Sequence, residues 1–538
     1  MSKDVRIIIV NNVKLPINAS HKEAFIVARS RLSSIGIKVK DSDCYIYRKS
    51  VDARRKNEIS FVYSVACRTD AQIKEERLSK NGMALLVPGE IKPVISEAPM
   101  SVPPVVVGTG PAGLFAALLL AEHGYAPIVL ERGGSVEERR EAIRRLKEYR
   151  ILDPDTNIQF GAGGAGTFSD GKLVTRVNDP LLSYVLSRFV EFGAPEDIKF
   201  IAKPHIGTDI LSVVVENMLS RIESLGGRVL YNTKFLSINS CGAQVRGVVT
   251  DKGEIECAAV ILAIGHSARD TYEYLLKSGF AVEPKPFSVG MRIEHRTEDI
   301  DRAMYGNFAG DPRLSHAEYA LSHNTKERGV YTFCMCPGGE VVAATSEEGG
   351  VVVNGMSENS RSGVNSNSAV VCSVFREDYG NTPASAIEFQ RKIERAAFAA
   401  GGSDYSAPII TVSDFINGTL KSEPKRIIPT YMNGEGVRLA RPESYLPEFT
   451  INAIKGALFT FDKKLAGFAS PDAVLTGAET RTSAPIRILR DPVTHLAVGF
   501  KNFYPAGEGA GYAGGISSAA LDGIKTALSL MKEFGPLK

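Results

Sequence analysis

A glycine turn between two apolar segments limits how this 538-residue chain can fold. Pro104–Val107 is a short β-branched segment typical of a buried strand, and GTGPAG follows it at once. The apolar segment Leu114–His123 has the length of a helix, and Ile128–Leu130 has the pattern of a second strand. Strand, glycine turn, helix and strand in this order predict a parallel βαβ unit that binds a nucleotide, and therefore an α/β fold.

Each glycine of this turn has a physical task. Gly108 permits the tight turn, Gly110 lets the backbone approach a pyrophosphate, and Gly113 lets the helix pack against the strand. The pyrophosphate then lies at the helix N-terminus, where free amides favour an anion. Glu131 ends the second strand, where a carboxylate accepts from ribose hydroxyls and disfavours a 2′-phosphate. The predicted nucleotide contacts are Gly108, Gly110, Pro111, Ala112, Gly113, Glu131 and Arg132.

Composition describes an ordinary globular protein. Hydrophobic residues make up 44% and charged residues 23% of the chain, which excludes a disordered or fibrous protein. The net charge of +3 is too small to imply a nucleic-acid or membrane partner. Seven cysteines without a CxxC pair predict neither a disulfide framework nor a metal site. The charged start MSKDVRIIIV does not resemble a signal peptide, and glycines interrupt the apolar stretch Val105–Ala121, so we expect a cytoplasmic protein.

The N-terminal 100 residues differ from the rest in charge. They carry 18 Lys and Arg against 11 Asp and Glu, whereas the remainder is slightly acidic. Strands are expected at Val5–Val10, Cys44–Tyr47 and Ile59–Cys67, with a helix at His21–Ile35. This βαββ order predicts a small ferredoxin-like α+β domain over residues 1–97, followed by a proline-bearing linker.

A basic segment, RKSVDARRKN, is expected to join two strands of this domain. Its charges allow contact with RNA phosphates. A solvated turn is the favoured interpretation, because the segment lacks interleaved exposed aromatic residues. The basic residues are Arg48, Lys49, Arg54, Arg55 and Lys56.

The C-terminal segment YPAGEGAGYAGGISSAALDGIKTA distinguishes FAD from NAD, since both use the first glycine motif. It resembles the closing motif of two-dinucleotide-binding flavoproteins, in which an acid contacts the ribityl–pyrophosphate region and a helix N-terminus faces the flavin. Here the strand is Phe503–Ala506, the pair is Gly507 and Glu508, and the helix begins at Gly515 and Ile516. The usual acid of those proteins is Asp, so Glu508 is a longer variant.

Further segments extend the resemblance over nearly the whole chain. AAVILAIGHSA resembles an internal strand end of those flavoproteins, with Ala263 and Gly265 near the cofactor. GAGGAGTFSDGKLVTR, KPFSVGMRIEH, CMCPGG and RTSAPIRI look like a bacterial family of FAD-dependent dehydrogenases with an N-terminal α/β domain. The resemblance implies an FAD-binding oxidoreductase without a settled substrate, and a fold similar to the glutathione-reductase-like flavoproteins. It further implies an FAD-binding domain at 103–269 and 481–538 around a mixed α+β substrate domain at 270–480.

A second glycine loop, GAGGAG at 161–166, is expected to face the flavin through Gly163, Gly164, Ala165 and Gly166. An ordinary surface loop is the alternative. No apolar strand precedes the loop, so we expect NADH or NADPH only as a transient electron donor. Thirteen of the 50 glycines lie in 108–113, 161–171 and 506–515, and we predict that these three loops converge on one FAD.

Candidate catalytic residues are weaker, because each has an ordinary structural explanation. His266 either faces the cofactor or caps a strand, and Tyr512 either flanks the flavin or is a packed aromatic. Lys172 lies near the flavin ring if the second glycine loop does. Arg481, together with Arg487, has the guanidinium geometry that holds an anionic substrate, unless both are ordinary paired arginines.

Two cysteines, Cys334 and Cys336, are expected on one strand with the same orientation. They form either a redox pair or, as is more usual for such cysteines, two small buried residues.

These observations favour an FAD-dependent oxidoreductase, a dehydrogenase or reductase that passes a hydride through flavin N5 to or from a small-molecule substrate. Two other hypotheses stay open. One is a flavoprotein that acts on RNA through its basic N-terminal domain. The other is a non-catalytic flavin-binding sensor.

Overall fold

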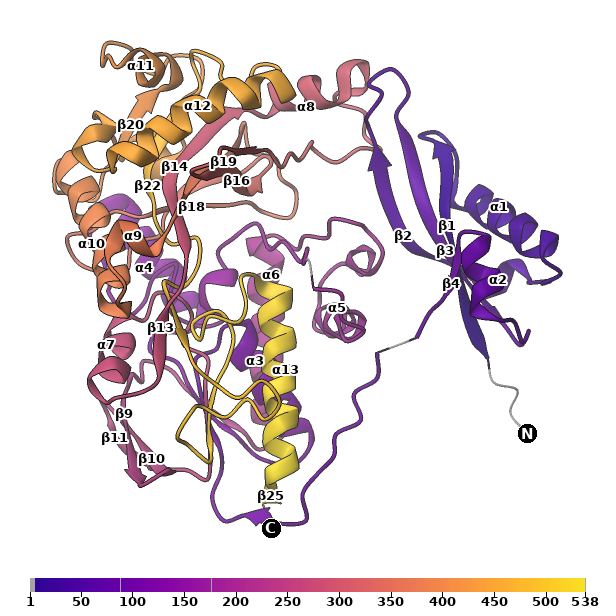
Figure 1. Ribbon diagram of the computed structural model, residues 1–538, viewed down its shortest axis with the longest axis horizontal. Coiled ribbons are helices and arrows are strands. Elements are labelled where there is room, and N and C mark those ends of the chain that lie inside the picture. The colour runs from indigo at the N-terminus through magenta and orange to yellow at the C-terminus, as the bar shows by residue number, and fades with distance from the viewer. Residues whose placement is uncertain (1–4, 88, 176, 538) are drawn as a thin grey trace.

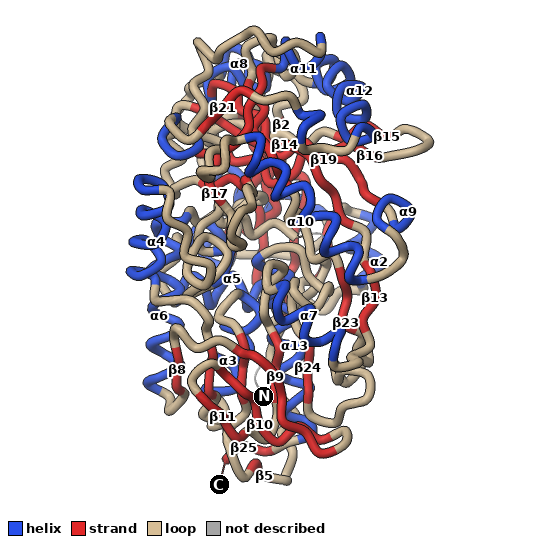
Figure 2. Tube along the Cα trace, turned by 90° about the vertical axis from the view of Figure 1, so that its left-hand side faces the viewer, coloured by secondary structure: helices blue, strands red, loops and turns tan. Residues whose placement is uncertain are grey.

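The computed structural model describes residues 5–87, 89–175 and 177–537. One part of the chain forms a five-stranded parallel sheet in the order β24-β12-β6-β7-β8. Figure 2 labels its two edge strands, β24 and β8. The expected βαβ unit is present, with its helix starting three residues earlier than predicted, at the proline that follows Gly110. The strands are β6 (Val105–Val107), β7 (Ile128–Leu130), β8 (Arg228–Leu230), β12 (Val260–Leu262) and β24 (Phe503–Pro505).

Both faces of this sheet are covered, which explains its continuously apolar strands. Val106 packs on the helix side, against α3 (Pro111–Glu122), α6 (Thr208–Ser224) and α13 (Ile516–Glu533). Val105 and Val107 belong to the core on the other side, where an antiparallel sheet lies. That sheet contains β9 (Phe235–Cys241), β10 (Gln244–Thr250) and β11 (Gly253–Glu256).

A second large sheet has seven strands in the order β15-β16-β19-β14-β22-β20-β21. All neighbouring strands are antiparallel except β20 and β21. Its long strands had mixed sequence patterns because they bury polar as well as apolar side chains, such as Arg292 and Glu294. The strands are β14 (Phe287–Arg296), β15 (Ser322–Asn324), β16 (Gly329–Cys336), β19 (Asn365–Val374), β20 (Ala407–Thr411), β21 (Val437–Leu439) and β22 (Val474–Glu479).

The N-terminal part forms a separate antiparallel sheet in the order β2-β3-β1-β4. It adds a helix and a strand to the expected βαββ order, and β2 continues to Asp52. Arg48 and Lys49 therefore lie within a strand, which corrects the expectation that the whole basic segment is a connection. The elements are β1 (Arg6–Pro16), α1 (His21–Ser34), β2 (Cys44–Asp52), β3 (Ser60–Thr69), α2 (Glu75–Lys80) and β4 (Met83–Leu85).

An extended segment connects this sheet to the rest of the chain (Figure 1). It leads to β5 (Pro99–Met100), which pairs with β25 (Gly535–Leu537) near the C-terminus. The sheet also touches the body directly, because the Lys49 amide donates to the Phe200 carbonyl oxygen at 2.7 Å.

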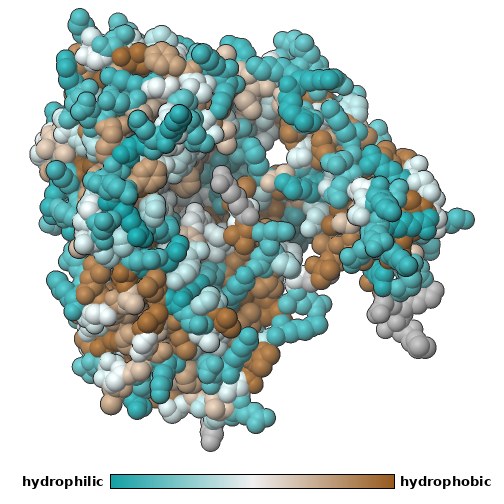
Figure 3. Space-filling view, viewed as in Figure 1, coloured by the Kyte–Doolittle hydropathy of each residue, from teal (hydrophilic) through white to brown (hydrophobic). Residues whose placement is uncertain are grey.

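The remaining elements connect these sheets and cover them. No described helix has an apolar stretch long enough to cross a membrane. In Figure 3, apolar residues gather on the part of the surface that carries β9–β11. The elements are α4 (Val136–Tyr149), α5 (Leu182–Glu191), α7 (Arg269–Lys277), β13 (Val282–Pro284), α8 (Thr297–Tyr305), β17 (Glu340–Ala343), β18 (Val353–Met356), α9 (Arg376–Tyr379), α10 (Pro383–Ala400), α11 (Val412–Asn417), α12 (Glu448–Lys464) and β23 (Ile486–Ile488).

Candidate functional site

One cavity of about 330 Å³ collects residues from all three glycine-rich loops. Side chains of the seven-stranded sheet contribute to the same lining. The predicted site residues that line it are Gly108, Gly110, Pro111, Ala112, Glu131, Arg132, Gly164, Ala165, Gly166, Lys172, Ala263, Gly265, His266, Arg481, Glu508, Gly515 and Ile516. Gly113, Gly163, Gly507 and Tyr512 are not among the described residues that line it.

The first two glycine loops touch each other through backbone. Gly164 has a φ of +62°, and a Cβ on it would lie 2.9 Å from the Gly110 Cα. A Cβ on Gly113 would lie 1.9 Å from the Gly108 carbonyl oxygen. Gly113 thus works beneath the cavity, as the helix-packing argument predicted, while Gly163 and Gly507 pack against neighbouring side chains.

Glu131 links the two loops. One carboxylate oxygen accepts from the Thr109 amide at 3.0 Å and from the Thr109 hydroxyl at 2.5 Å. The other accepts from the amides of Gly133 and Gly161, at 3.1 and 2.9 Å. The carboxylate therefore holds the cavity wall in shape and also borders the cavity, where ribose hydroxyls are its expected partners.

Arg139 of α4 is a site-shaping residue that the sequence analysis missed. Its fully buried guanidinium donates to the carbonyl oxygens of Asn157, Ile158 and Gly164 at 3.1, 2.9 and 3.0 Å. It also donates to the Ala162 carbonyl oxygen. Burial lowers the pKa of Arg139 to about 9. The residue thereby organises the second glycine loop from inside, and an arginine within an amphipathic helix gives no sign of this in the sequence.

Arg132 lies at the rim of the cavity. Its guanidinium packs 4.3 Å from the centre of the Phe160 ring and pairs with Asp270 at 2.8 Å. Asp155 is a second carboxylate nearby, at 3.5 Å. The side chain is therefore held as part of the wall.

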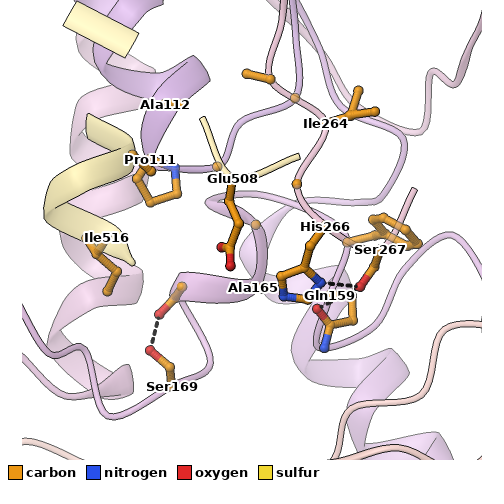
Figure 4. Close-up of a pocket in the computed structure, with 18 of the residues that line it drawn as sticks. Pro111, Ala112, Gln159, Ala165, Ser169, Ile264, His266, Ser267, Glu508 and Ile516 are labelled. Carbon is orange, nitrogen blue, oxygen red and sulfur yellow. Dashed lines mark hydrogen bonds between the residues drawn. The ribbon is translucent and has the colours of Figure 1, made fainter. Parts of the chain in front are cut away.

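The C-terminal loop supplies the central acid. Figure 4 shows the Glu508 carboxylate pointing into the cavity between Ile516 and His266. Burial raises the pKa of Glu508 to about 7, although the positive charge of Lys285 opposes the shift. Ile516 begins α13, so the N-terminus of that helix opens onto the same space.

His266 faces the cavity as a neutral imidazole. Its Nδ1 lies 2.9 Å from the Ser267 hydroxyl, which in turn donates to the Gln159 amide oxygen at 3.2 Å. Burial lowers the pKa of His266 to about 3, and the charge of Arg481 contributes. The ring is therefore placed to take part in hydrogen bonds rather than to carry a charge.

Arg481 lines the cavity, but a protein carboxylate already neutralises it. Its guanidinium contacts both oxygens of the buried Glu394, at 3.2 and 3.0 Å. Glu394 also pairs with Arg269 at 2.7 Å. Arg487 lies elsewhere, 3.6 Å from Glu283 and outside the described lining. The geometry thus favours the structural explanation for both arginines over an anion-binding pair.

Lys172 and Tyr512 have different surroundings. The Lys172 ammonium donates to the Met335 carbonyl oxygen and lies 3.6 Å from Glu318. The Tyr512 hydroxyl donates to the Ile488 carbonyl oxygen at 3.0 Å, and the Arg490 guanidinium covers its ring at 3.8 Å. Tyr512 is thus a packed aromatic, whereas Lys172 belongs to the cavity wall.

The seven-stranded sheet closes the cavity with residues that sequence reasoning did not assign to the site. Glu479, at the end of β22, accepts from Arg292 at 2.9 Å. Their pairing joins strands far apart in sequence, so no local pattern identified it. The further lining residues from this part of the chain are Phe333, Cys334, Asn354, Glu479 and Thr482.

The basic residues of the N-terminal sheet are largely engaged within it. Arg54 pairs with Asp52 at 2.8 Å, and Arg55 lies 3.6 Å from Glu58. The Lys49 ammonium covers the Phe61 ring at 4.1 Å. Among the described residues, no group of three or more His, Cys, Asp or Glu is arranged to hold a metal ion.

The residues of the cavity fit an FAD. Two helix N-termini, those of α3 and α13, open onto it, and each favours negative charge. The close contact between Gly110 and Gly164 leaves a backbone surface where a pyrophosphate can approach. Glu131 and Glu508 add acceptors at two separate places on the wall.

Comparison with known proteins assigns the cofactor. A family model described as "FAD-dependent protein, C-terminal domain-like" matches residues 286–482, which include much of the seven-stranded sheet. A protein of Clostridium beijerinckii, described as "Uncharacterized protein", is 44% identical over 495 residues. The match covers 91% of this chain and 92% of that protein. FAD is therefore the cofactor of this type of protein.

Solved structures resemble the chain more distantly. Glycine oxidase from Bacillus cereus has a TM-score of 0.35 at 11% identity, over 81% of this chain and 98% of its own. L-amino acid deaminase from Proteus vulgaris has a TM-score of 0.32 at 12% identity, over 84% and 98%. CtdE in complex with FAD has a TM-score of 0.31 at 13% identity, over 81% and 88%. At these TM-scores the three structures carry no argument about the reaction.

Proposed function

Because the chain belongs to the same family as the Clostridium beijerinckii protein and matches the FAD-dependent C-terminal domain, we propose that it is an FAD-dependent oxidoreductase acting on a small molecule. The reaction we propose is hydride transfer between the substrate and flavin N5. The observation that carries the proposal is the meeting of three glycine loops and two helix N-termini at one cavity.

Each part of the cavity has a task in this proposal. The N-terminus of α3, at Gly110–Ala112, would hold the pyrophosphate, and Glu131 would accept from the adenosine ribose. Glu508 would accept from the ribityl chain. The N-terminus of α13 at Ile516 would lie beside the isoalloxazine ring and stabilise its negative charge.

When bound, FAD supplies a two-electron acceptor and donor. The chain supplies the surroundings. Glu508 has a pKa near neutral, so its carboxylate can hold or release a proton at physiological pH. His266 offers a neutral imidazole for orienting a substrate. The residues of the seven-stranded sheet that line the cavity would shield a bound substrate from water.

The first test is the spectrum of the purified protein. We expect flavin absorption bands, or their appearance when FAD is added to the colourless protein. Rapid anaerobic mixing with NADH, NADPH and a panel of small metabolites should then bleach the bands with at least one donor. A protein that takes up no FAD would contradict the proposal. FAD that binds but is reduced by none of these donors would favour a flavin-binding sensor.

A further inference from the structure

Cys334 and Cys336 lie at the end of β16, where the seven-stranded sheet borders the cavity. Cys334 lines the cavity and is partly exposed, whereas Cys336 is fully buried. The Cys336 thiol donates to the Cys334 carbonyl oxygen at 3.4 Å. None of the other five cysteines is among the described lining residues.

The strand is irregular at this point. Phe333 pairs with Ala369 of β19 and Cys336 with Asn367, so three residue steps of β16 face two of β19. Cys334 has a φ of +45°, in the left-handed region that few residues other than glycine adopt. Bulges of this kind re-aim side chains and are common beside active sites.

The bulge also shortens the distance between the two cysteines. Three residue steps occupy the length of about 7 Å that two ordinary strand steps take. Two residues apart in a regular strand, Cα atoms lie at the outer end of the range of about 4.4–6.8 Å that a disulfide spans. Compression of the strand by the bulge therefore favours a spacing of Cys334 and Cys336 that a disulfide can bridge.

Charged groups from several elements influence the partly exposed Cys334. The Arg292 guanidinium of β14 donates to the Cys334 carbonyl oxygen at 3.1 Å. The hydrogen bond from Cys336, followed by the charges of Arg292 and Lys172, lowers the pKa of Cys334, whereas burial and the charge of Glu479 oppose this. A lowered pKa raises the thiolate fraction, which is the reactive form of cysteine.

We propose that Cys334 and Cys336 are a redox-active dithiol that exchanges two electrons with the flavin, an inference that rests on the function proposed above. When the dithiol is oxidised, both S–H bonds break and one S–S bond forms. The two electrons and one proton pass to the flavin. The second proton passes to Glu508, which lines the same cavity as Cys334. Reduction of the disulfide by the reduced flavin has the same balance of atoms and electrons.

The test counts electrons. A second cysteine pair must be removed first, because the sulfur atoms of Cys44 and Cys67 lie 3.2 Å apart in the N-terminal sheet. All proteins therefore carry Cys44→Ser. They are loaded with FAD, oxidised with diamide, freed of reagent and titrated anaerobically with dithionite. We expect two two-electron equivalents per flavin for this reference protein and one for its Cys334→Ser and Cys336→Ser variants.

The matched control is Cys372→Ser on the neighbouring strand β19. Cys372 is fully buried, and burial raises its pKa to about 11, so this variant should still take two equivalents. A second readout does not depend on the flavin. Trypsin releases residues 329–361 as one peptide, because no lysine or arginine lies between them. In the oxidised protein this peptide should resist alkylation and weigh two hydrogen atoms less than the dithiol form.

The outcomes separate the two proposals. If the reference protein binds FAD but takes one equivalent, and both cysteines of the peptide remain open to alkylation, the dithiol proposal is overturned and the oxidoreductase proposal stands. If the spectrum recorded before titration shows that no FAD binds, both proposals fail.

Discussion

Glu508 is an acidic side chain of the cavity wall whose pKa is near neutral. Its carboxylate points into the space between Ile516 and His266 (Figure 4) and is raised to a pKa of about 7 by burial. An acid with this pKa is half ionised near neutral pH. It can therefore accept from a sugar-like hydroxyl in one protonation state and donate in the other.

The raised pKa makes the stability of the FAD-free protein depend on pH. The folded state keeps the Glu508 proton up to about pH 7, whereas the unfolded chain loses it above about pH 4.3. The free energy of unfolding therefore falls as the pH rises between these values, by roughly 3–4 kcal/mol for this group. Glu508→Gln should raise the melting temperature by a few degrees at pH 8 and much less at pH 5. Glu298→Gln, an exposed control, should change neither. An equal gain at both pH values would show that burial does not shift this carboxyl.

The glycine loops act as whole elements. Loop 161–166 is held from inside by Arg139 and lies against the start of α3, so its backbone borders the cavity on that side. Contacts this close are possible only between residues without side chains. The position of α3 relative to the second loop is thus set by Gly110 and Gly164.

Gly164→Ala should separate these two loops. Its Cβ would lie 2.9 Å from the Gly110 Cα, and the φ of +62° adds a cost of roughly 1 kcal/mol for alanine. We expect FAD affinity, measured by quenching of flavin fluorescence, to fall by about tenfold or more, which corresponds to about 1.4 kcal/mol. The control is Gly456→Ala in α12, where a Cβ meets nothing within 4 Å and helix propensity improves slightly. Unchanged affinity in both variants would remove the second loop from the FAD site.

At the scale of the whole molecule, buried charges beside the cavity connect segments that are far apart in the sequence. Glu394 of α10 pairs with Arg269 of α7 and with Arg481, which follows β22. These residues come from segments more than 80 positions apart, and the side chains of all three are almost fully buried. The network therefore links α7 to α10 and to the end of the seven-stranded sheet. The attraction between these charges offsets the free-energy cost of burying them only while both arginines keep their shared carboxylate.

Glu394→Gln should destabilise the whole fold. It leaves two buried guanidinium groups without their carboxylate, a loss of roughly 3–5 kcal/mol. The paired arginines hold the pKa of Glu394 far below its usual range, against the opposing effect of burial. The stabilisation is therefore present above about pH 4.3 and is lost as the pH falls further. In chemical denaturation, the difference between variant and wild type should shrink below pH 4. Glu388→Gln, which removes a half-exposed partner of Arg391, should cost less than about 1 kcal/mol.

Local segments were the most predictable part of the molecule. The strand Ile128–Leu130 has the predicted ends, and the helix expected at His21–Ile35 begins at His21 and ends one residue earlier, at Ser34. The long strands β14 and β19 were not predicted, because their buried polar side chains hide the alternation typical of a strand. In the candidate site, the backbone contributors were easier to identify than the side chains.

Glycine spacing alone located the tight turn between β6 and α3, because steric limits on backbone turns act within a few residues. Only the folded structure decides what surrounds the side chains of Arg481, Tyr512 and Cys334. The Arg481 guanidinium pairs with Glu394, which lies 87 positions away in the sequence, and the Tyr512 ring packs beneath Arg490. Cys334 became a cavity residue through a bulge against β19. Charge pairing and exposure depend on which distant segments are buried together, and no local pattern contains that information.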